Sequence, residues 1–251
     1  MCGITGFVKT ADRTYATEPV LRSVFEVMQI RGEHASGIAA LMGSKKKREI
    51  GVAKGNVPST EFVQRDEWKE FVPRANVLIA HTRYAVYGNP SDNINNHPHS
   101  TDDYKYSLIH NGIVHDRPKS VRGLLKSKCD SEILLRLLEK NGVVKGFRKI
   151  AHMKRSSVAV LVIKADTGVL YAYRNEHSPL VYCDLTTEIG GLLFASTAEL
   201  MVEGIRKAGF DFGDIERRCA PIIPNVVYAF TTKRRYPKTK VLTESVVQTV
   251  T

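Results

Sequence analysis

CGITGFV, Cys2–Val8, is the stretch of sequence that decides how the fold is read. It places a cysteine directly behind Met1 and in front of a glycine and a short apolar run, a pattern typical of a buried β-strand. A lone cysteine near an amino terminus is most often a small buried hydrophobe. The rest of the sequence must therefore decide whether Cys2 is a buried core residue or a reactive thiol.

The composition predicts a globular protein. Of the 251 residues, 43% are hydrophobic, which is enough for a large buried core. No linker rich in proline, glycine or serine divides the chain, so we expect a single domain over residues 2–251. The amino-terminal segment lacks the apolar block of a signal peptide, and no run is long and apolar enough for a membrane span. We therefore expect a cytoplasmic protein without a membrane partner.

The net charge of +11 is concentrated in basic runs. Solvated loops account for such runs, although clustered positive charge also attracts acidic partners. No RNA-recognition, helix-turn-helix or zinc-finger motif accompanies the charge, so we do not expect nucleic acid as a partner. The runs are SKKKRE (Ser44–Glu49), RKIAHMKR (Arg148–Arg155) and TKRRYPKTK (Thr232–Lys240).

Cysteines and histidines show no metal-binding spacing. The four cysteines, at positions 2, 129, 183 and 219, form no CxxC pair, so we expect reduced thiols rather than a disulfide framework. His97 and His99 flank a proline, and His81, His110 and His115 lie in the same region, but there is no HExxH motif. We therefore predict no metal and no cofactor.

Hydrophobic periodicity divides the chain into short apolar strands and amphipathic helices, which indicates sheets covered by helices. Helices are predicted after Pro19, with Gly32 beyond the end, at Thr60–Phe71, at Asp130–Lys140 and near Ala198–Lys207. Strands are predicted at Gly3–Val8, Ser36–Gly43, Arg48–Lys54, Ala75–Ala85, Tyr106–Gly112, Ser157–Ile163, Val169–Tyr173, Leu180–Tyr182, Gly191–Ser196, Val226–Thr231 and Lys240–Val247.

Three of these strands carry reactive or polar groups at an end. Cys2 precedes the first, His81-Thr82-Arg83 closes a second, and Asn111-Gly112 closes a third. Polar groups that gather at strand ends are a common way for a rigid scaffold to present a site. Each piece alone has a simpler explanation, since an Asn-Gly pair often forms a turn and Asp130 suits a helix cap.

Taken together and in this order, the motifs are far more specific than any one of them. They are CGITGFV (2–8), RGEHASGIA (31–39), AHTRYAVYGNPS (80–91), NNHPHS (95–100), IHNGIVHD (109–116), CDSEILL (129–135) and FASTAEL (194–200). The set resembles the glutaminase domain of class II glutamine amidotransferases, a family that includes glucosamine-phosphate synthase, amidophosphoribosyltransferase and asparagine synthetase. The resemblance implies the N-terminal-nucleophile hydrolase fold, an α+β four-layer αββα sandwich of two mainly antiparallel sheets between helical layers.

The resemblance also implies roles for the motif residues. Removal of Met1 would leave a thiol and a free amine on Cys2, and the amine, with a pKa near 8, can relay the thiol proton. Attack on L-glutamine would give a γ-glutamyl thioester and ammonia, with the Asn111 amide and the Gly112 backbone N–H as oxyanion donors.

Further residues are expected to bind the substrate. Arg83 would bind the α-carboxylate of glutamine and Asp130 its α-ammonium group. Thr82 and His97 would make secondary contacts, and Gly32 would form a wall beside Cys2. Ser196, in FASTAEL, is expected behind the site without a chemical role.

This sequence departs from the family pattern at the pocket wall. Tyr84 stands where a tryptophan is common, Tyr87 where a histidine is, and His34 where an aspartate is. Only about twenty residues follow the matched region, too few for a synthase domain, so we expect a stand-alone subunit that delivers ammonia to a separate acceptor enzyme. Two alternatives stay open: a hydrolase of another γ-glutamyl amide, and a catalytically idle regulatory module.

Overall fold

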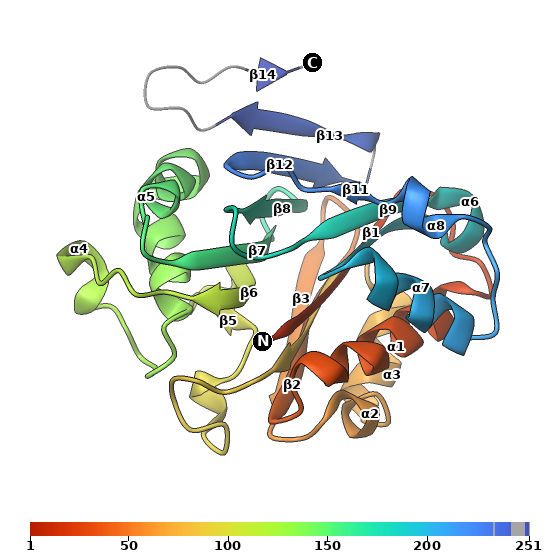
Figure 1. Ribbon diagram of the computed structural model, residues 1–251, viewed down its shortest axis with the longest axis horizontal. Coiled ribbons are helices and arrows are strands. Elements are labelled where there is room, and N and C mark those ends of the chain that lie inside the picture. The colour runs from red at the N-terminus through yellow and green to blue at the C-terminus, as the bar shows by residue number, and fades with distance from the viewer. Residues whose placement is uncertain (233, 242–248, 251) are drawn as a thin grey trace.

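Two antiparallel sheets form the centre of the fold (Figure 1). The computed structural model describes residues 1–232, 234–241 and 249–250. The first sheet has the order β11-β9-β10-β1-β4-β2-β3, and the second has the order β14-β13-β12-β8-β7-β6-β5. The strands are β1 (Gly3–Lys9), β2 (Ala35–Gly43), β3 (Arg48–Gly55), β4 (Val77–Arg83), β5 (His99–Ser100), β6 (Tyr106–Ile113), β7 (Ser157–Lys164), β8 (Val169–Arg174), β9 (Val181–Leu185), β10 (Gly191–Ala195), β11 (Ala220–Pro221), β12 (Val226–Thr231), β13 (Arg234–Val241) and β14 (Thr249–Val250).

Helices cover the outer faces of both sheets. Figure 1 shows α5 on one side of the molecule and α1, α3 and α7 on the opposite side, with the amino terminus between them. The α-helices are α1 (Thr17–Val27), α2 (Ser59–Phe62), α3 (Asp66–Arg74), α4 (Lys119–Arg122), α5 (Glu132–Ala151), α6 (Thr186–Ile189), α7 (Ala198–Lys207) and α8 (Ile215–Arg218). Two 3₁₀ turns, η1 (Met28–Arg31) and η2 (Asn93–Asn95), lie beside the candidate site.

Three hydrophobic clusters correspond to the three interfaces of a four-layer sandwich. One joins α1, α3 and α7 to the first sheet through side chains such as Phe25 and Trp68. A second lies between the sheets and includes Ile4 and Ile79 from the first sheet and Leu161 from the second. The third joins α5 to the second sheet. The predicted αββα sandwich is confirmed.

The alternation of side chains along each strand decides which groups meet between the sheets. In β1, Ile4 and Val8 enter the inter-sheet core, so Cys2 is in phase with them. In β4, Val77 and Ile79 do the same, which puts His81 and Arg83 on the inter-sheet side. Asn111 is likewise in phase with Ile109 of β6. The strand ends therefore direct a thiol, a guanidinium and an amide into one space.

The elements differ from the predicted ones in a few places. The helix predicted at Thr60–Phe71 is two helices, α2 and α3, because the backbone is extended at Arg65. The helix predicted to end at Asn141-Gly142 only kinks there: Gly142 has a φ of 71°, which suits a residue without a side chain, and α5 then continues to Ala151. Of the strand predicted at Lys240–Val247, the first two residues belong to β13, and residues 242–247 lie outside the described residues.

Among the residues that the structure describes, no helix combines the length and the apolar character needed to cross a bilayer.

Candidate active site

Cys2 lies at the amino end of β1, against the residue that follows β4. Gly3 pairs with Thr82, so the next position along brings Cys2 beside Arg83 and Tyr84. The Tyr84 backbone N–H lies 3.4 Å from the Cys2 Sγ, and Arg31 donates from Nε to the Cys2 carbonyl at 2.9 Å. These two contacts hold both the thiol and the backbone of Cys2 in place.

Opposing effects act on the Cys2 thiol. Burial raises its pKa, and the Tyr84 backbone hydrogen bond, the chain's amino terminus and Arg83 lower it. The carboxylate of Asp130 raises it further. Arg83 and Asp130 are therefore close enough for their charges to act on the sulfur. Met1, which still blocks the Cys2 amine, is 74% exposed.

Thr82 is near Cys2, but its side chain is on the other face of β4. Its hydroxyl donates to the Met28 carbonyl at 2.8 Å, and it is completely buried. A Cβ on Gly3 would come within 2.4 Å of the Thr82 hydroxyl oxygen and 2.8 Å of the Met28 carbonyl. Thr82 therefore packs beneath the first strand and sets the position of Cys2. Its predicted contact with substrate stays a prediction.

Asn111 and Gly112 face this space from the second sheet. Asn111 is 1% exposed, and its Nδ2 has no hydrogen-bond partner among the described residues. Gly112 has a φ of 138°, and a Cβ there would come within 2.0 Å of the Ser157 carbonyl oxygen. The backbone conformation at Gly112, within β6, thus requires glycine. The unpartnered Nδ2 of Asn111 is thus followed in the chain by the backbone N–H of Gly112, whose conformation is constrained.

A buried hydrogen bond joins the two sheets next to these residues. His81 of β4 donates from Nε2 to the carbonyl of His110 in β6 at 2.9 Å. His110 in turn donates from Nε2 to the Ser157 carbonyl, so its Nδ1 accepts from the Ser131 hydroxyl at 2.8 Å. Burial lowers the pKa of His81 to about 3, which keeps this ring neutral. Asn111 is therefore fixed relative to β4.

Arg83 is buried and held by the loop that follows β4. It donates from Nη1 to Asn96 Oδ1 at 2.7 Å and from Nη2 to the carbonyls of Tyr87 and Gly88. Asn96 in turn donates to the Pro90 carbonyl at 2.7 Å. The sequence pattern pointed to Arg83 but not to Asn96, although Asn96 lies within the matched NNHPHS motif.

Asp130 lies just before α5, where the sequence suggested a helix cap. The N-cap is Ser131, and Asp130 Oδ2 instead accepts from the backbone N–H of Val114 at 2.6 Å. That bond ties the carboxylate to the segment directly after β6. The capping interpretation of Asp130 is wrong, because this side chain reaches toward the second sheet rather than the first turn of α5.

Gly32, predicted to form a wall beside Cys2, packs against the backbone of Arg83 and Tyr84. A Cβ on Gly32 would come within 2.4 Å of the Tyr84 nitrogen, so the chain can approach Tyr84 closely only with glycine there. His34 accepts from the Ala85 N–H at 2.9 Å, and its ring lies 4.9 Å from that of Tyr84. Two of the departures from the family pattern, His34 and Tyr84, thus contact each other.

Ser196 lies behind the first strand. The backbone N–H of Ile4 donates to its hydroxyl oxygen at 2.9 Å, and Ser196 itself is completely buried. This contact agrees with the expected structural role.

His97 lies in a group of buried aromatic rings. Its ring centroid is 4.0 Å from that of His81 and 4.6 Å from that of His99. Burial lowers the pKa of His97 and His99 well below the ordinary histidine value, so both rings are neutral. Cys129, which comes from a distant part of the sequence, brings its sulfur to the same place. No local spacing predicted that meeting.

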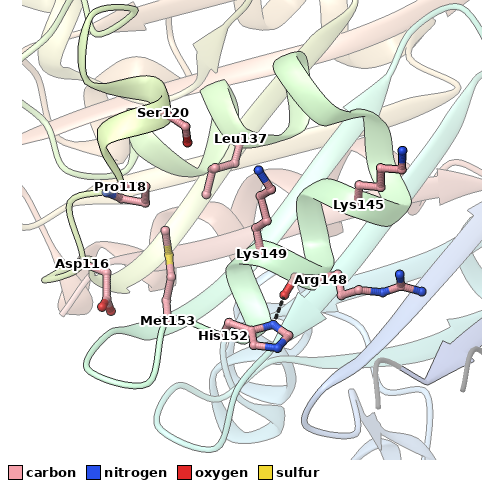
Figure 2. Close-up of a pocket in the computed structure, with 9 residues that line it drawn as sticks. All are labelled: Asp116, Pro118, Ser120, Leu137, Lys145, Arg148, Lys149, His152 and Met153. Carbon is pink, nitrogen blue, oxygen red and sulfur yellow. Dashed lines mark hydrogen bonds between the residues drawn. The ribbon is translucent and has the colours of Figure 1, made fainter. Parts of the chain in front are cut away.

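A separate pocket of about 600 Å³ contains none of these candidate residues (Figure 2). Basic side chains from the second half of α5 face it, and Leu137 and Met153 make it partly apolar. Its only histidine, His152, is bonded through Nδ1 to the Arg148 carbonyl. The pocket offers charge, but no cysteine lines it. It is lined by Asp116, Pro118, Ser120, Leu137, Lys145, Arg148, Lys149, His152 and Met153.

Known proteins resemble this chain in sequence and in fold. No family model matches the sequence. A glutamine–fructose-6-phosphate aminotransferase (isomerizing) of Halalkalibacterium halodurans is 30% identical over 192 residues, which are 72% of this chain and 30% of the relative. A protein of the same name from Pyrococcus horikoshii is 31% identical over 195 residues, again 72% of this chain and 30% of the relative. The chain thus matches less than a third of the length of these relatives.

Solved structures extend the likeness to nearly the whole chain. The glutamine phosphoribosylpyrophosphate amidotransferase from B. subtilis, solved with ADP and GMP, superposes with a TM-score of 0.71. The superposition covers 98% of this chain and 50% of that protein, at 16% sequence identity. At this identity the likeness concerns the fold, and it supports the same four layers.

Proposed function

The chain holds a domain of the class II glutamine amidotransferase family, and on this premise we propose that it hydrolyses L-glutamine to glutamate and ammonia with Cys2 as nucleophile. The observation that carries the proposal is that Cys2 and Asn111, on opposite sheets, are both in phase with side chains of the inter-sheet core. Cys2 is in phase with the inter-sheet face of β1, and the Asn111 amide, buried in β6, has no partner among the described residues. A nucleophile and an unused hydrogen-bond donor are what amide hydrolysis needs.

Activation of Cys2 begins with the removal of Met1. Met1 is exposed, and the side chain behind it is small, so the bond between them is accessible. The amine then freed on Cys2 accepts the thiol proton as the sulfur forms a bond to the amide carbon of glutamine. The carbonyl electron pair moves onto oxygen. When the pair returns, the C–N bond breaks, and the ammonium group on Cys2 gives its proton to the departing nitrogen.

Water completes the reaction. It attacks the γ-glutamyl thioester, the C–S bond breaks, and the sulfur leaves as thiolate. One proton of the attacking water goes back to the Cys2 amine, so glutamate is released and the enzyme is restored. Both tetrahedral intermediates carry an oxyanion, which Asn111 Nδ2 and the Gly112 N–H would stabilise. Removing one such donor typically costs about 3 to 4 kcal/mol of barrier.

The charged ends of glutamine select the substrate. Arg83 would bind the α-carboxylate and Asp130 the α-ammonium group. In support of this assignment, the charge of Arg83 lowers the pKa of the Cys2 thiol and that of Asp130 raises it. His97 and Gly32 would complete the wall. Thr82 would act indirectly, through its bond to the Met28 carbonyl beneath the first strand.

We further propose that the glutaminase domain accounts for residues 2–251 and that the ammonia passes to a separate acceptor enzyme. Apolar side chains project into solvent at, and two residues after, the residue whose backbone contacts the Cys2 thiol. Tyr84 is 51% exposed and Val86 is 59% exposed. Exposed apolar groups in one place are typical of a surface that a partner covers, and covering this one would keep ammonia from escaping into water.

The test is a glutaminase assay on protein whose Met1 removal has been verified by intact mass. Ammonia and glutamate should form in equal amounts, and Cys2→Ala should abolish both. Cys219→Ala is the matched control, because Cys219 is also a half-buried free thiol but lies beside β11. A Cys2→Ala protein with wild-type ammonia release would overturn the mechanism. Larger γ-glutamyl amides tested in parallel decide whether free glutamine is the preferred substrate.

A further inference from the structure

Three side chains of the kinds that bind metal ions lie close together beside the site. The proposed mechanism gives the three no common role. His97, His99 and Cys129 each offer one nitrogen or sulfur atom, and these atoms all lie within 4.8 Å of one another. All three residues are at least 95% buried. His97 lies just before β5, His99 is the first residue of β5, and Cys129 precedes Asp130, so only the tertiary fold brings the three together.

The nitrogens in this group lack the partners that buried polar atoms normally have. Neither ring nitrogen of His97 has a hydrogen-bond partner among the described residues, and neither does Nε2 of His99. Burying an unpaired polar group typically costs about 1 to 3 kcal/mol. The sulfur of Cys129 has a long contact, 3.8 Å, with Oδ1 of Asp130, and it also interacts with the side chain and the backbone of Ser131. Three unpartnered nitrogens and a thiol are therefore available to a ligand.

We propose that His97, His99 and Cys129 bind a soft transition-metal ion, Zn²⁺ in the first place. Two imidazoles and one thiolate form a donor set that zinc accepts, whereas Mg²⁺ and Ca²⁺ require oxygen ligands. The neutral rings have a free electron pair for the ion. Binding releases one proton, that of the Cys129 thiol, as the sulfur–metal bond forms. A fourth position stays open for a small ligand.

Positive charge nearby limits which kinds of metal ion the site can bind. Lys54 donates from Nζ to the carbonyls of Asn96 at 2.8 Å and Pro98 at 3.3 Å, and Arg83 binds the same loop. These positive side chains repel any metal ion that is attracted by charge alone. Binding therefore depends on direct bonds to sulfur and nitrogen, which favours soft ions over hard ones of equal charge.

A bound ion would connect two parts of the proposed glutamine pocket. Asn96, which holds Arg83, precedes His97, and Asp130 follows Cys129. The ion would thus fix the distance between the groups proposed for the α-carboxylate and the α-ammonium. This consequence rests on the proposed function, whereas the site itself does not.

Direct binding measurements test the proposal on the full chain after chelator treatment. One equivalent of Zn²⁺ should bind per chain and raise the Tm. Co²⁺ in place of Zn²⁺ should give a thiolate-to-metal charge-transfer band in the near ultraviolet. Cys129→Ser should abolish that band and weaken Zn²⁺ binding by more than the 10- to 100-fold typical for loss of an outer-shell partner.

Two control variants locate the ion. Cys183→Ser, at a buried thiol of β9, should leave the band and the stoichiometry unchanged. Cys2→Ser should do the same. A band that survives Cys129→Ser but disappears with Cys2→Ser would show metal on the nucleophile instead, and would overturn the proposal. So would a wild-type chain that neither retains one equivalent of Zn²⁺ nor gains thermal stability from it. Because this readout needs no turnover, its failure is separate from any failure of the glutaminase assay.

Discussion

Arg83 donates a hydrogen bond from Nη1 to Asn96 Oδ1 across 2.7 Å, and both residues are buried. The guanidinium is therefore oriented by the loop that folds over the end of β4, not by β4 alone. Its Nη2 binds two carbonyls of the same loop, at Tyr87 and Gly88. The proposed binding of the substrate carboxylate by Arg83 therefore depends on the conformation of this loop.

Asn96→Ala should raise the KM for glutamine about tenfold and leave kcat within about twofold. The change removes the partner that orients Arg83, which amounts to about 1.4 kcal/mol of substrate binding, without touching Cys2. Steady-state kinetics with glutamine measures both constants. Asn141→Ala is the control, since the Asn141 amide binds the Leu137 carbonyl within α5 and should leave KM unchanged. A kcat effect larger than the KM effect would contradict this role.

Asn111→Ala should lower kcat about 100- to 1,000-fold with little change in KM, because the lost donor acts on the oxyanion rather than on bound glutamine. Single-turnover measurement of thioester formation checks the step affected. Asn111→Asp preserves the shape but replaces the donor with a charge of the wrong sign, so it should be at least as slow. If either variant keeps wild-type kcat, Asn111 is not an oxyanion donor.

Gly112→Ala should destabilise the fold by about 3 kcal/mol or more, since the new Cβ meets the Ser157 carbonyl and the backbone stays in a region that side chains avoid. Urea unfolding monitored by circular dichroism gives the free energy. Gly123→Ala is the matched control: a Cβ there has no atom within 4 Å, so stability should stay the same or rise by about 0.5 kcal/mol. Equal effects of the two changes would argue against the constrained backbone at Gly112.

Removal of Met1 should speed alkylation of Cys2 at about pH 7. Burial raises the pKa of this thiol, so a chain that keeps Met1 has little thiolate at neutral pH and reacts faster only as the pH rises. Removal brings the ammonium charge onto the same residue, which favours the thiolate. The difference should shrink above about pH 8, where the amine loses its proton. Iodoacetamide labelling followed by intact mass compares the two forms; equal rates at neutral pH would refute the effect.

The family resemblance implied the four layers of the fold, and local patterns predicted most of the strands and pointed to candidate site residues. Apolar alternation located most of the described strands, but it missed the two-residue strands β5, β11 and β14 and gave only the last two residues of β13. Polar residues at strand ends pointed to Cys2 and Asn111. The same alternation also explains Thr82: it lies between His81 and Arg83, so it must face away from them. The role of Asp130 was harder to predict, because a capping residue and one that bonds to another strand look the same in sequence.

Contacts between distant segments could not be predicted in this way. Asn96 reaches Arg83 only because the loop between β4 and β5 folds back on itself, and Cys129 meets His97 only after α5 has packed on the second sheet. The kink at Gly142 is similar: Asn-Gly is a reasonable end for a helix, and only packing against the second sheet extends α5 to Ala151.

Because the site is divided between two sheets, turnover requires that the two sheets stay packed against each other. Cys2 adjoins one sheet and Asn111 belongs to the other, and the buried His81–His110 hydrogen bond of 2.9 Å joins the two sheets. A molten globule that kept both sheets but loosened their packing would retain its far-ultraviolet signal and still be inactive. During denaturation, ammonia release should therefore disappear with the inter-sheet core, ahead of any loss of secondary structure.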